Sequence, residues 1–268
     1  MWRKRLEGGG IFLDGLTPQP GTVLKAGQRL AWRRPPWEEP DAPLFYSVLY
    51  EDKDLLAVAK PCGLPTLPGG GFLNHTLLAL VRASYPEAAP MHRLGRGTSG
   101  AVLFARNAEA RSAICAAWRS NGVTKVYRAL ASGVPEKDEL VIEDPIGPAP
   151  HPLLGTVYAA GPGGKRGLSR VRVIERRGSC SLLDVRIETG RPHQIRIHLA
   201  AAGFPLQGDP LYAPGGGFRE PGTALPGDGG YLLHAARLCL RHPATGSPFE
   251  VSCRPPPELG LHAESSIS

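Results

Sequence analysis

The sequence predicts an α+β fold with a mixed, mostly antiparallel sheet, and three observations lead to that expectation. Short apolar runs with β-branched residues recur at 126–131, 169–175 and 182–187, and such runs favour strands. Residues 76–83 and 108–118 have helical character. Strands and helices do not alternate in the regular order of a parallel sheet, which favours an α+β arrangement.

The first 40 residues are expected to form a separate segment. Residues 10–15 predict a strand entering a turn, and residues 23–30 predict a second strand. This pair resembles the C-terminal half of an S4-type RNA-binding module whose helical half is absent, and a plain hairpin that pads the main domain is the alternative. The Pro-rich stretch 35–40 predicts a stiff linker. We therefore expect an S4-like hairpin remnant and linker at 1–40, and the main domain at 41–268.

The main domain is expected to begin with two short apolar strands. Residues 48–50 and 55–59 flank a polar break, which predicts a hairpin. Asn107 is an acceptable N-cap for the helix that follows it, because its side chain can accept a hydrogen bond from the first turn. Two Gly- and Pro-rich stretches, 145–167 and 213–230, predict long surface loops.

The charge balance of the chain is basic. The 268 residues carry a formal net charge of +7. Lys and Arg neutralise phosphates and release counterions, so this balance suits a polyanionic partner. A generally solvated basic surface is the alternative. A hydrophobic content of 42% is ordinary for a globular chain, so a substantial core is expected.

The cysteine pattern excludes a disulfide framework and a structural zinc site. The five cysteines are odd in number and scattered without a C-x-x-C, which indicates reduced thiols in a cytosolic protein. Cys239 and His242 lie close together but lack a second pair, so no metal is expected. Three glycines, residues 8–10, stand where a signal peptide needs an apolar core, and no apolar run is long enough to span a bilayer. We expect a cytoplasmic protein without a membrane partner.

Residues 91–106, MHRLGRGTSGAVLFAR, are the most informative segment. The glycines at 95, 97 and 100 fit the G-x-G-x-x-G fingerprint of dinucleotide-binding loops. The context excludes that interpretation, because a strand-like apolar run follows where a helix is required. The expected acid is also missing, since no Asp or Glu occurs between Glu109 and Glu136. No nucleotide cofactor is therefore expected.

Six segments of the chain match one family pattern in order. They are residues 60–65 (KPCGLP), 91–106, 125–130 (KVYRAL), 189–199 (TGRPHQIRIHL), 208–212 (GDPLY) and 233–235 (LHA). Together they closely resemble the RluA-type pseudouridine synthases, which isomerise uridine in structured RNA. The resemblance implies an RNA-binding cleft, an rRNA or tRNA partner and no cofactor. The fourth residue of that family's central motif is the catalytic aspartate, and here it is Gly95.

The resemblance also assigns roles to single residues. Gly95 stands at the catalytic position, Tyr127 matches the base-contacting tyrosine, and Arg196 matches the arginine that pairs with the acid. Without an aspartate at position 95, Arg196 would hold a phosphate, a water or another acid. A tyrosine in a core strand is the alternative for Tyr127. The residues assigned to RNA binding are His92, Arg93, Arg96, Arg191 and His193.

Some of these roles have simpler alternatives. His92 is expected to shape its loop through hydrogen bonds, and Arg93 could be a solvated charge. No nearby residue obviously replaces the missing acid, because Asp209 belongs to a turn motif of its own and Asp54 lies in the early hairpin. Two hypotheses therefore stand: an active RNA pseudouridine synthase, and a catalytically silent RNA-binding protein on the same scaffold. The sequence does not set the oligomeric state, and a monomer is expected.

Overall fold

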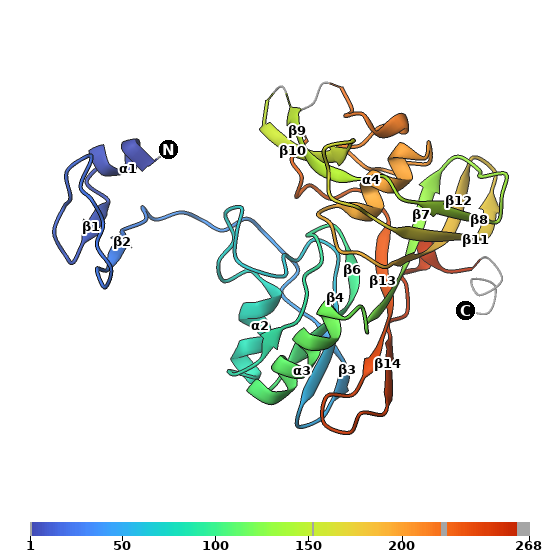
Figure 1. Cartoon of the computed structure of the whole chain (residues 1–268), viewed down its shortest axis with the longest axis horizontal. Coiled ribbons are helices and arrows are strands. Elements are labelled where there is room, and N and C mark those ends of the chain that lie inside the picture. Colours follow the sequence, from blue (N-terminus) through green and yellow to red (C-terminus); the bar gives the residue numbers. More distant parts are fainter. Residues whose placement is uncertain (1, 152, 221–223, 262–268) are drawn as a thin grey trace. The chain divides into compact units, whose positions relative to one another are not determined.

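The computed structural model describes residues 2–151, 153–220 and 224–261. The chain divides into two compact units, residues Met1–Glu39 and Pro40–Ser268 (Figure 1). The division falls within the Pro-rich stretch that precedes the main domain.

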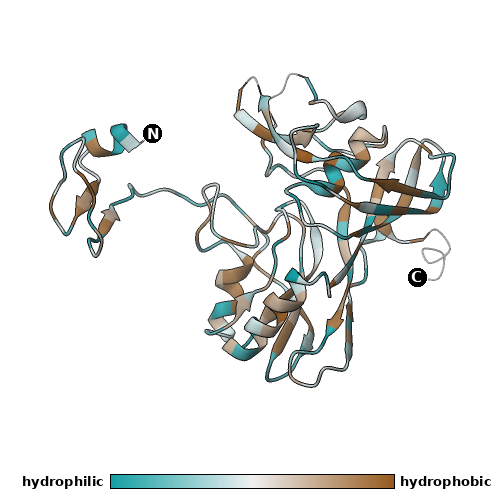
Figure 2. Ribbon diagram, viewed as in Figure 1, coloured by the Kyte–Doolittle hydropathy of each residue, from teal (hydrophilic) through white to brown (hydrophobic). Residues whose placement is uncertain are grey.

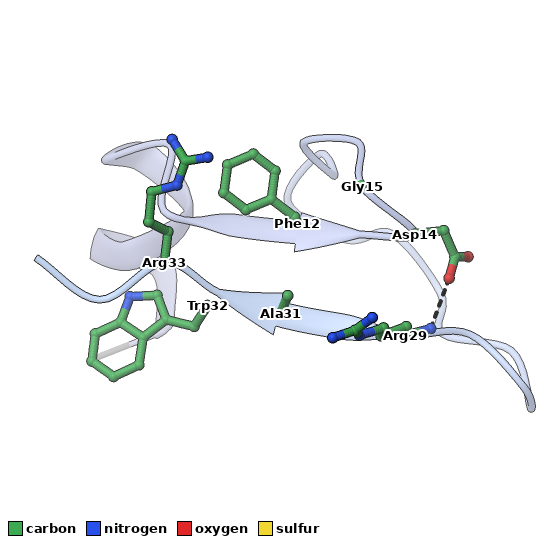
Figure 3. A pocket seen from close by; sticks show the side chains of 7 residues that line it. All are labelled: Phe12, Asp14, Gly15, Arg29, Ala31, Trp32 and Arg33. Carbon is green, nitrogen blue, oxygen red and sulfur yellow. Dashed lines mark hydrogen bonds between the residues drawn. The ribbon is translucent and has the colours of Figure 1, made fainter. Parts of the chain in front are cut away.

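The first unit is a small hairpin with a short helix. Its elements are α1 (Trp2–Glu7), β1 (Ile11–Leu13) and β2 (Leu30–Trp32), and the two strands are antiparallel. The strand predicted at 23–30 is wrong, because the ladder begins only at Leu30. Val23 and Leu24 are 79% and 56% exposed and face no strand among the described residues, so their apolar character does not indicate one. Asp14 fixes the end of the loop that joins β1 to β2. Its carboxylate accepts a hydrogen bond from the Arg29 N–H at 2.7 Å (Figure 3).

The small hairpin combines aromatic rings with cations. A shallow pocket there is lined by Phe12, Asp14, Gly15, Arg29, Ala31, Trp32 and Arg33 (Figure 3). The Arg5 guanidinium lies 3.8 Å from the centre of the Trp32 ring, and that of Arg33 lies 5.2 Å from the centre of the Phe12 ring. Both distances allow cation–π attraction. Only Ile11 and Leu13 are buried among the described residues of this unit, so most of its apolar side chains remain accessible.

The second unit is built on one large sheet. Its strands are β3 (Ser47–Glu51), β4 (Leu55–Lys60), β5 (Ala89–Pro90), β6 (Ser99–Ala105), β7 (Thr124–Ser132), β8 (Glu139–Ile142), β11 (Ser169–Arg177), β12 (Cys180–Ile187), β13 (Leu233–Arg241) and β14 (Pro248–Ser252). Within the described residues these ten strands run in the order β3-β4-β6-β13-β7-β12-β11-β8, with β5 beside β6 and β14 beside β13 (Figure 1). All pairs are antiparallel except β6 with β13. The predicted α+β class and mostly antiparallel sheet are confirmed.

A short parallel ladder joins the two halves of the sheet. It pairs His234 with Ser99 and Ala235 with Gly100. Gly100 has a φ of +114°, and a β-carbon there would come within 2.4 Å of the Ala235 backbone. Only glycine therefore allows β6 and β13 to approach so closely.

Two helices cover opposite faces of β4 and β6. Because strand side chains alternate, Leu56 and Val58 belong to the cluster that contains α2 (Leu77–Ser84), while Leu55 and Ala57 belong to the cluster that contains α3 (Ala108–Arg119). Figure 2 shows α2 in largely hydrophobic colours. Asn107 caps α3 as predicted, since its side-chain oxygen accepts from the Ala110 N–H at 2.8 Å.

The other half of the unit carries a helix and a two-stranded ribbon. The helix is α4 (Gln194–Ala201), and the ribbon is β9 (Ile146–His151) paired with β10 (Gly155–Ala160). The loop predicted at 145–167 is therefore wrong in its first part. Ile146 packs in a cluster with Ile197 of α4, and this burial outweighs the Gly- and Pro-rich composition. The described part of 213–230 is a loop with one 3-10 turn, Pro214–Gly216, and a second turn lies at Pro257–Leu259.

No helix among the described residues has both the length and the apolar character needed to cross a bilayer.

Candidate active site

The loop that contains Gly95 is hydrogen-bonded to the segment at residues 60–66. The ammonium group of Lys60 donates hydrogen bonds to the carbonyls of Leu64 at 2.7 Å and Arg96 at 3.3 Å. The Thr66 hydroxyl donates to the Leu94 carbonyl at 2.9 Å and accepts from the Leu94 N–H at 3.1 Å. Lys60 is 1% exposed, and this burial lowers the pKa of its ammonium to about 7. The matched segments 60–65 and 91–106 thus form one supported loop.

Gly95 itself is exposed, and Tyr231 occupies the space beside it. The φ of Gly95 is outside the left-handed region, so its backbone does not require glycine. A β-carbon at this position would lie 3.0 Å from the Tyr231 hydroxyl oxygen and 3.6 Å from Oγ1 of Thr98. A β-carbon at Gly97 would lie 3.0 Å from the Tyr231 ring and 2.9 Å from the backbone of Gly229. The two glycines make room for a tyrosine ring.

Arg196 has an acid as its partner, and that acid is Asp209. The guanidinium donates from Nε to Oδ2 at 2.7 Å and from Nη2 to Oδ1 at 2.8 Å. The exposed fractions are 3% for Arg196 and 1% for Asp209. Burial opposes ionisation of Asp209, but Arg196 and the N–H groups of Leu211 and Tyr212 outweigh it and lower the pKa of the carboxyl. Of the three partners expected for Arg196, the structure has the acid, and it comes from the turn motif at 208–212.

Arg196 also lies between two tyrosine rings. Its guanidinium carbon is 4.3 Å from the centre of the Tyr231 ring and 5.1 Å from the centre of the Tyr212 ring. Both distances allow cation–π attraction, which is stronger where water is excluded. The Tyr231 hydroxyl lies 3.2 Å from Oγ1 of Thr98. Tyr231 therefore contacts both the Gly95 loop and Arg196.

His193 begins α4 in the left-handed conformation and is held by a tyrosine. Its Nδ1 lies 3.0 Å from the Tyr212 hydroxyl, which itself donates to the Tyr158 carbonyl at 2.8 Å. The hydroxyl has one proton, so it accepts from the Nδ1–H of a neutral ring. Burial, together with the positive charges of Arg196 and Arg93, lowers the pKa of His193 to about 4. Arg93 of the Gly95 loop thus acts on the charge of His193 at the start of α4.

The arginines assigned to RNA binding differ in whether their side chains already form hydrogen bonds within the protein. Arg96 donates to the Gly227 carbonyl at 3.0 Å and pairs with Asp228 at 3.2 Å. Arg191 donates to the Arg166 carbonyl at 2.8 Å. Arg93 is exposed, and no partner for its side chain is found among the described residues. Of the three, Arg93 is the one available to a phosphate without breaking an internal contact.

Tyr127 and His92 are less exposed than Arg93. Tyr127 is 9% exposed, and burial raises the pKa of its phenol to about 12. It belongs to the core cluster that also contains Leu94 and Tyr231. Nε2 of His92 accepts a hydrogen bond from the Leu103 N–H at 3.0 Å, which supports the loop-shaping role. Burial lowers the pKa of His92 to about 4, so the ring is neutral.

One group of residues has the composition of a metal site but a different hydrogen-bond pattern. Ligand atoms of Asp52, Asp54 and His242 lie within 4.8 Å of one another. Nδ1 of His242 accepts from the N–H groups of Ala244 and Thr245, so the proton of a neutral ring is on Nε2, which lies 2.8 Å from the Asp52 carboxylate. His242 then has no free lone pair for an ion. The group instead ties the β3–β4 turn to the β13–β14 hairpin.

Sequence reasoning missed Tyr231 and gave Asp209 too small a role. Tyr231 lies just before the short 233–235 match and belongs to no matched segment, so only the spacing of Gly95 and Gly97 hinted that something approaches the loop. Asp209 was visible as part of a motif, but the motif does not reveal a partner on α4.

Comparisons with known proteins match much of the chain that builds this site, including Gly95, Tyr127 and Arg196. A family model described as RNA pseudouridylate synthase matches residues 54–201. An uncharacterized RNA pseudouridine synthase of Synechocystis is 45% identical, with 96% of this chain and 89% of that protein covered. RNA pseudouridine synthase 5 of Arabidopsis thaliana is 41% identical, with 89% and 79% covered. Ribosomal large subunit pseudouridine synthase D of Pseudomonas aeruginosa is 35% identical, with 91% and 81% covered.

A solved structure agrees with these relatives. Human RNA pseudouridylate synthase domain containing 1 has a TM-score of 0.62 and 26% identity, with 83% of this chain and 89% of that chain covered. The family match spans more than half of the 268 residues, and it includes Gly95, Tyr127 and Arg196. The family predicted from the sequence is thereby confirmed, and the chain belongs to the RNA pseudouridylate synthase family.

Proposed function

We propose that this protein isomerises uridine to pseudouridine in rRNA or tRNA. The observation that carries the proposal is the family match over residues 54–201, which spans the Gly95 loop, Tyr127 on β7 and Arg196 on α4. The relative named ribosomal large subunit pseudouridine synthase D favours rRNA as the first substrate to test. The net charge of +7 suits either RNA.

The reaction makes limited demands on the protein. The bond between N1 and the ribose C1′ breaks, the uracil turns, and C5 bonds to C1′. One proton leaves C5 and one is gained at N1, so neither an oxidant nor a reductant is needed. The target base must leave its helix to be reached. The residue proposed to hold a phosphate next to the flipped nucleotide is Arg93, which is exposed and whose positive charge acts on His193.

A second candidate function follows from the same site. Gly95 has no side chain and so cannot act as nucleophile, acid or base. Asp209 is buried in its pair with Arg196 and is not free to replace an acid. A protein that binds structured RNA without isomerising it would fit these two observations. The family relationship favours the enzyme.

The proposed cellular setting is the cytoplasm, and the proposed state is a monomer. The five cysteines are free thiols, which fits a reducing compartment.

The deciding experiment measures tritium release from RNA labelled at C5 of uridine. Total rRNA and tRNA from cells that lack the protein are the substrates, because their target uridines remain unmodified. Release that depends on the protein, with pseudouridine appearing at one or a few mapped positions, is the expected result. Tight, salt-sensitive RNA binding with no release from either RNA would leave the silent binder as the function.

A further inference from the structure

The Tyr231 hydroxyl stands where a side chain at position 95 would begin. It lies 3.0 Å from the place of a β-carbon on Gly95, closer than ordinary van der Waals contact. Gly95 is exposed although Tyr231 is 4% exposed, so the hydroxyl end of the ring adjoins the accessible face of the loop. A longer side chain at position 95 would therefore begin in contact with the phenol oxygen of Tyr231.

The glycines at 95 and 97 have no backbone reason to be glycine. Neither has a φ in the left-handed region. Glycine in a loop carries an entropic cost on folding, so a close approach is the remaining structural reason for it. Tyr231 lies 3.0 Å from the β-carbon place at both positions, and at Gly97 the Gly229 backbone is also close, at 2.9 Å. The loop and the tyrosine are thus fitted to each other.

The charges around Tyr231 also suit a hydroxyl better than a second carboxylate. Arg196 already has a two-point partner in Asp209, with hydrogen bonds of 2.7 and 2.8 Å. A carboxylate at 95 would place a second negative charge near one guanidinium that is already neutralised. A neutral phenol over that guanidinium, 4.3 Å from its carbon, adds cation–π attraction without net charge.

We propose that the Tyr231 hydroxyl, hydrogen-bonded to Thr98, carries the proton in the isomerisation. It does so from the space that a side chain at position 95 would fill. This role rests on the proposed function. After the N1–C1′ bond has broken and C5 has bonded to C1′, the phenol gives its proton to N1. The resulting phenolate takes the proton from C5, and the phenol is restored. One proton is given and one taken, and Oγ1 of Thr98, 3.2 Å away, stabilises the phenolate by donating to it.

The test is Tyr231→Phe, which keeps the ring over Arg196 and removes only the hydroxyl. Tritium release should fall at least about 100-fold, the usual contribution of a positioned acid–base group. RNA affinity should stay unchanged, and the protein should stay folded with a slightly lower melting temperature, because the buried hydrogen bond to Thr98 is lost. The matched control is Tyr85→Phe. The Tyr85 hydroxyl, at the C-terminal end of α2, donates a hydrogen bond to Glu51, and loss of this hydroxyl should leave tritium release unchanged.

A second variant distinguishes a role of the Tyr231 hydroxyl in proton transfer from a role in holding the loop. Gly95→Asp combined with Tyr231→Phe places a carboxylate in the space that the hydroxyl leaves, and release should recover at least tenfold over Tyr231→Phe alone. A Tyr231→Phe protein that is folded and as active as the wild type would overturn the role of Tyr231 and leave the enzyme assignment intact. A wild type that releases no tritium from any RNA would overturn both.

Discussion

The carboxylate of Asp209 and the guanidinium of Arg196 form a two-point ion pair, at 2.7 and 2.8 Å, where both side chains are almost fully buried. The pair joins the turn at 208–212 to α4. It also fixes the guanidinium between the rings of Tyr212 and Tyr231. The position of Arg196 in the site is therefore set by an acid that is not the family's catalytic one.

Removing one partner of this pair should be costly. Asp209→Asn leaves a buried guanidinium without a counter-charge, and such changes cost about 3–5 kcal/mol. The free energy of unfolding, measured with urea, checks this. The control is Glu143→Gln, which breaks the pair with Arg166 at a site where both side chains are more than half exposed, and which should change stability by less than about 1 kcal/mol. Equal effects of the two variants would contradict the assigned burial.

Alanine at the three loop glycines should destabilise in a defined order. Gly95→Ala pushes against the tip of a hydroxyl at 3.0 Å and should cost about 1 kcal/mol or less. Gly97→Ala meets the Gly229 backbone at 2.9 Å and should cost about 1–3 kcal/mol. Gly100→Ala meets the Ala235 backbone at 2.4 Å in a strained conformation and should cost more than about 4 kcal/mol. Thermal unfolding gives the order, and a Gly95→Ala protein less stable than Gly100→Ala would contradict it.

Tyr127 should tolerate loss of its hydroxyl but not of its ring. At 9% exposure in the core, Tyr127→Ala should cost about 3–5 kcal/mol, so it tests packing and not base contact. Tyr127→Phe should keep the fold, and its effect on tritium release isolates the hydroxyl. A Tyr127→Ala protein as stable as the wild type would show that the ring faces the RNA and not the core.

Arg93 should contribute to RNA affinity in a salt-dependent way. Arg93→Ala removes an exposed charge beside His193 and should weaken binding at low salt, with a slope of log affinity against log salt smaller by about 1. The control is Arg241→Ala in the β13–β14 hairpin, whose loss should leave the slope unchanged. An identical slope for Arg93→Ala and the wild type would exclude a phosphate contact.

Stability should fall as the pH is lowered from about 6.5 to 4. Burial lowers the pKa of His92 and of His193 from 6.5 to about 4. Between these pH values the unfolded chain binds protons that the folded protein does not. Each histidine therefore lowers the free energy of unfolding by on the order of 3 kcal/mol by pH 4. Asp52 acts at lower pH. Its pKa falls from 3.8 to about 2 in the folded protein, so its stabilising contribution is lost as the pH falls from about 4 to about 2. Urea unfolding at pH 7, 5.5 and 4.5 measures the slope, which His193→Asn should reduce.

Sequence reasoning predicted the frame of this protein better than its site. A short apolar run located β4, and β-branched content located β7 and β12, because the side chains of all three strands are largely buried. The ribbon β9–β10 was missed, since Gly and Pro dominate it and its stability comes from packing against α4. The motifs placed Arg196 in the site. They did not reveal its partner Asp209, 13 residues further along the chain, because that contact forms only when the chain folds. The approach of Tyr231 to Gly95 left only the spacing of Gly95 and Gly97 as a local sign, and that spacing does not identify the tyrosine.

The place of β13 in the sheet has a consequence for how the chain is made. This strand comes near the end of the chain but lies between β6 and β7. During synthesis, the facing edges of β6 and β7 must therefore wait, unpaired, until residues 233–241 leave the ribosome. Exposed strand edges recruit other chains, so a stalled or truncated nascent protein should be unusually prone to aggregate. Dependence on a chaperone during translation is the expected cost of closing a sheet with its last long strand.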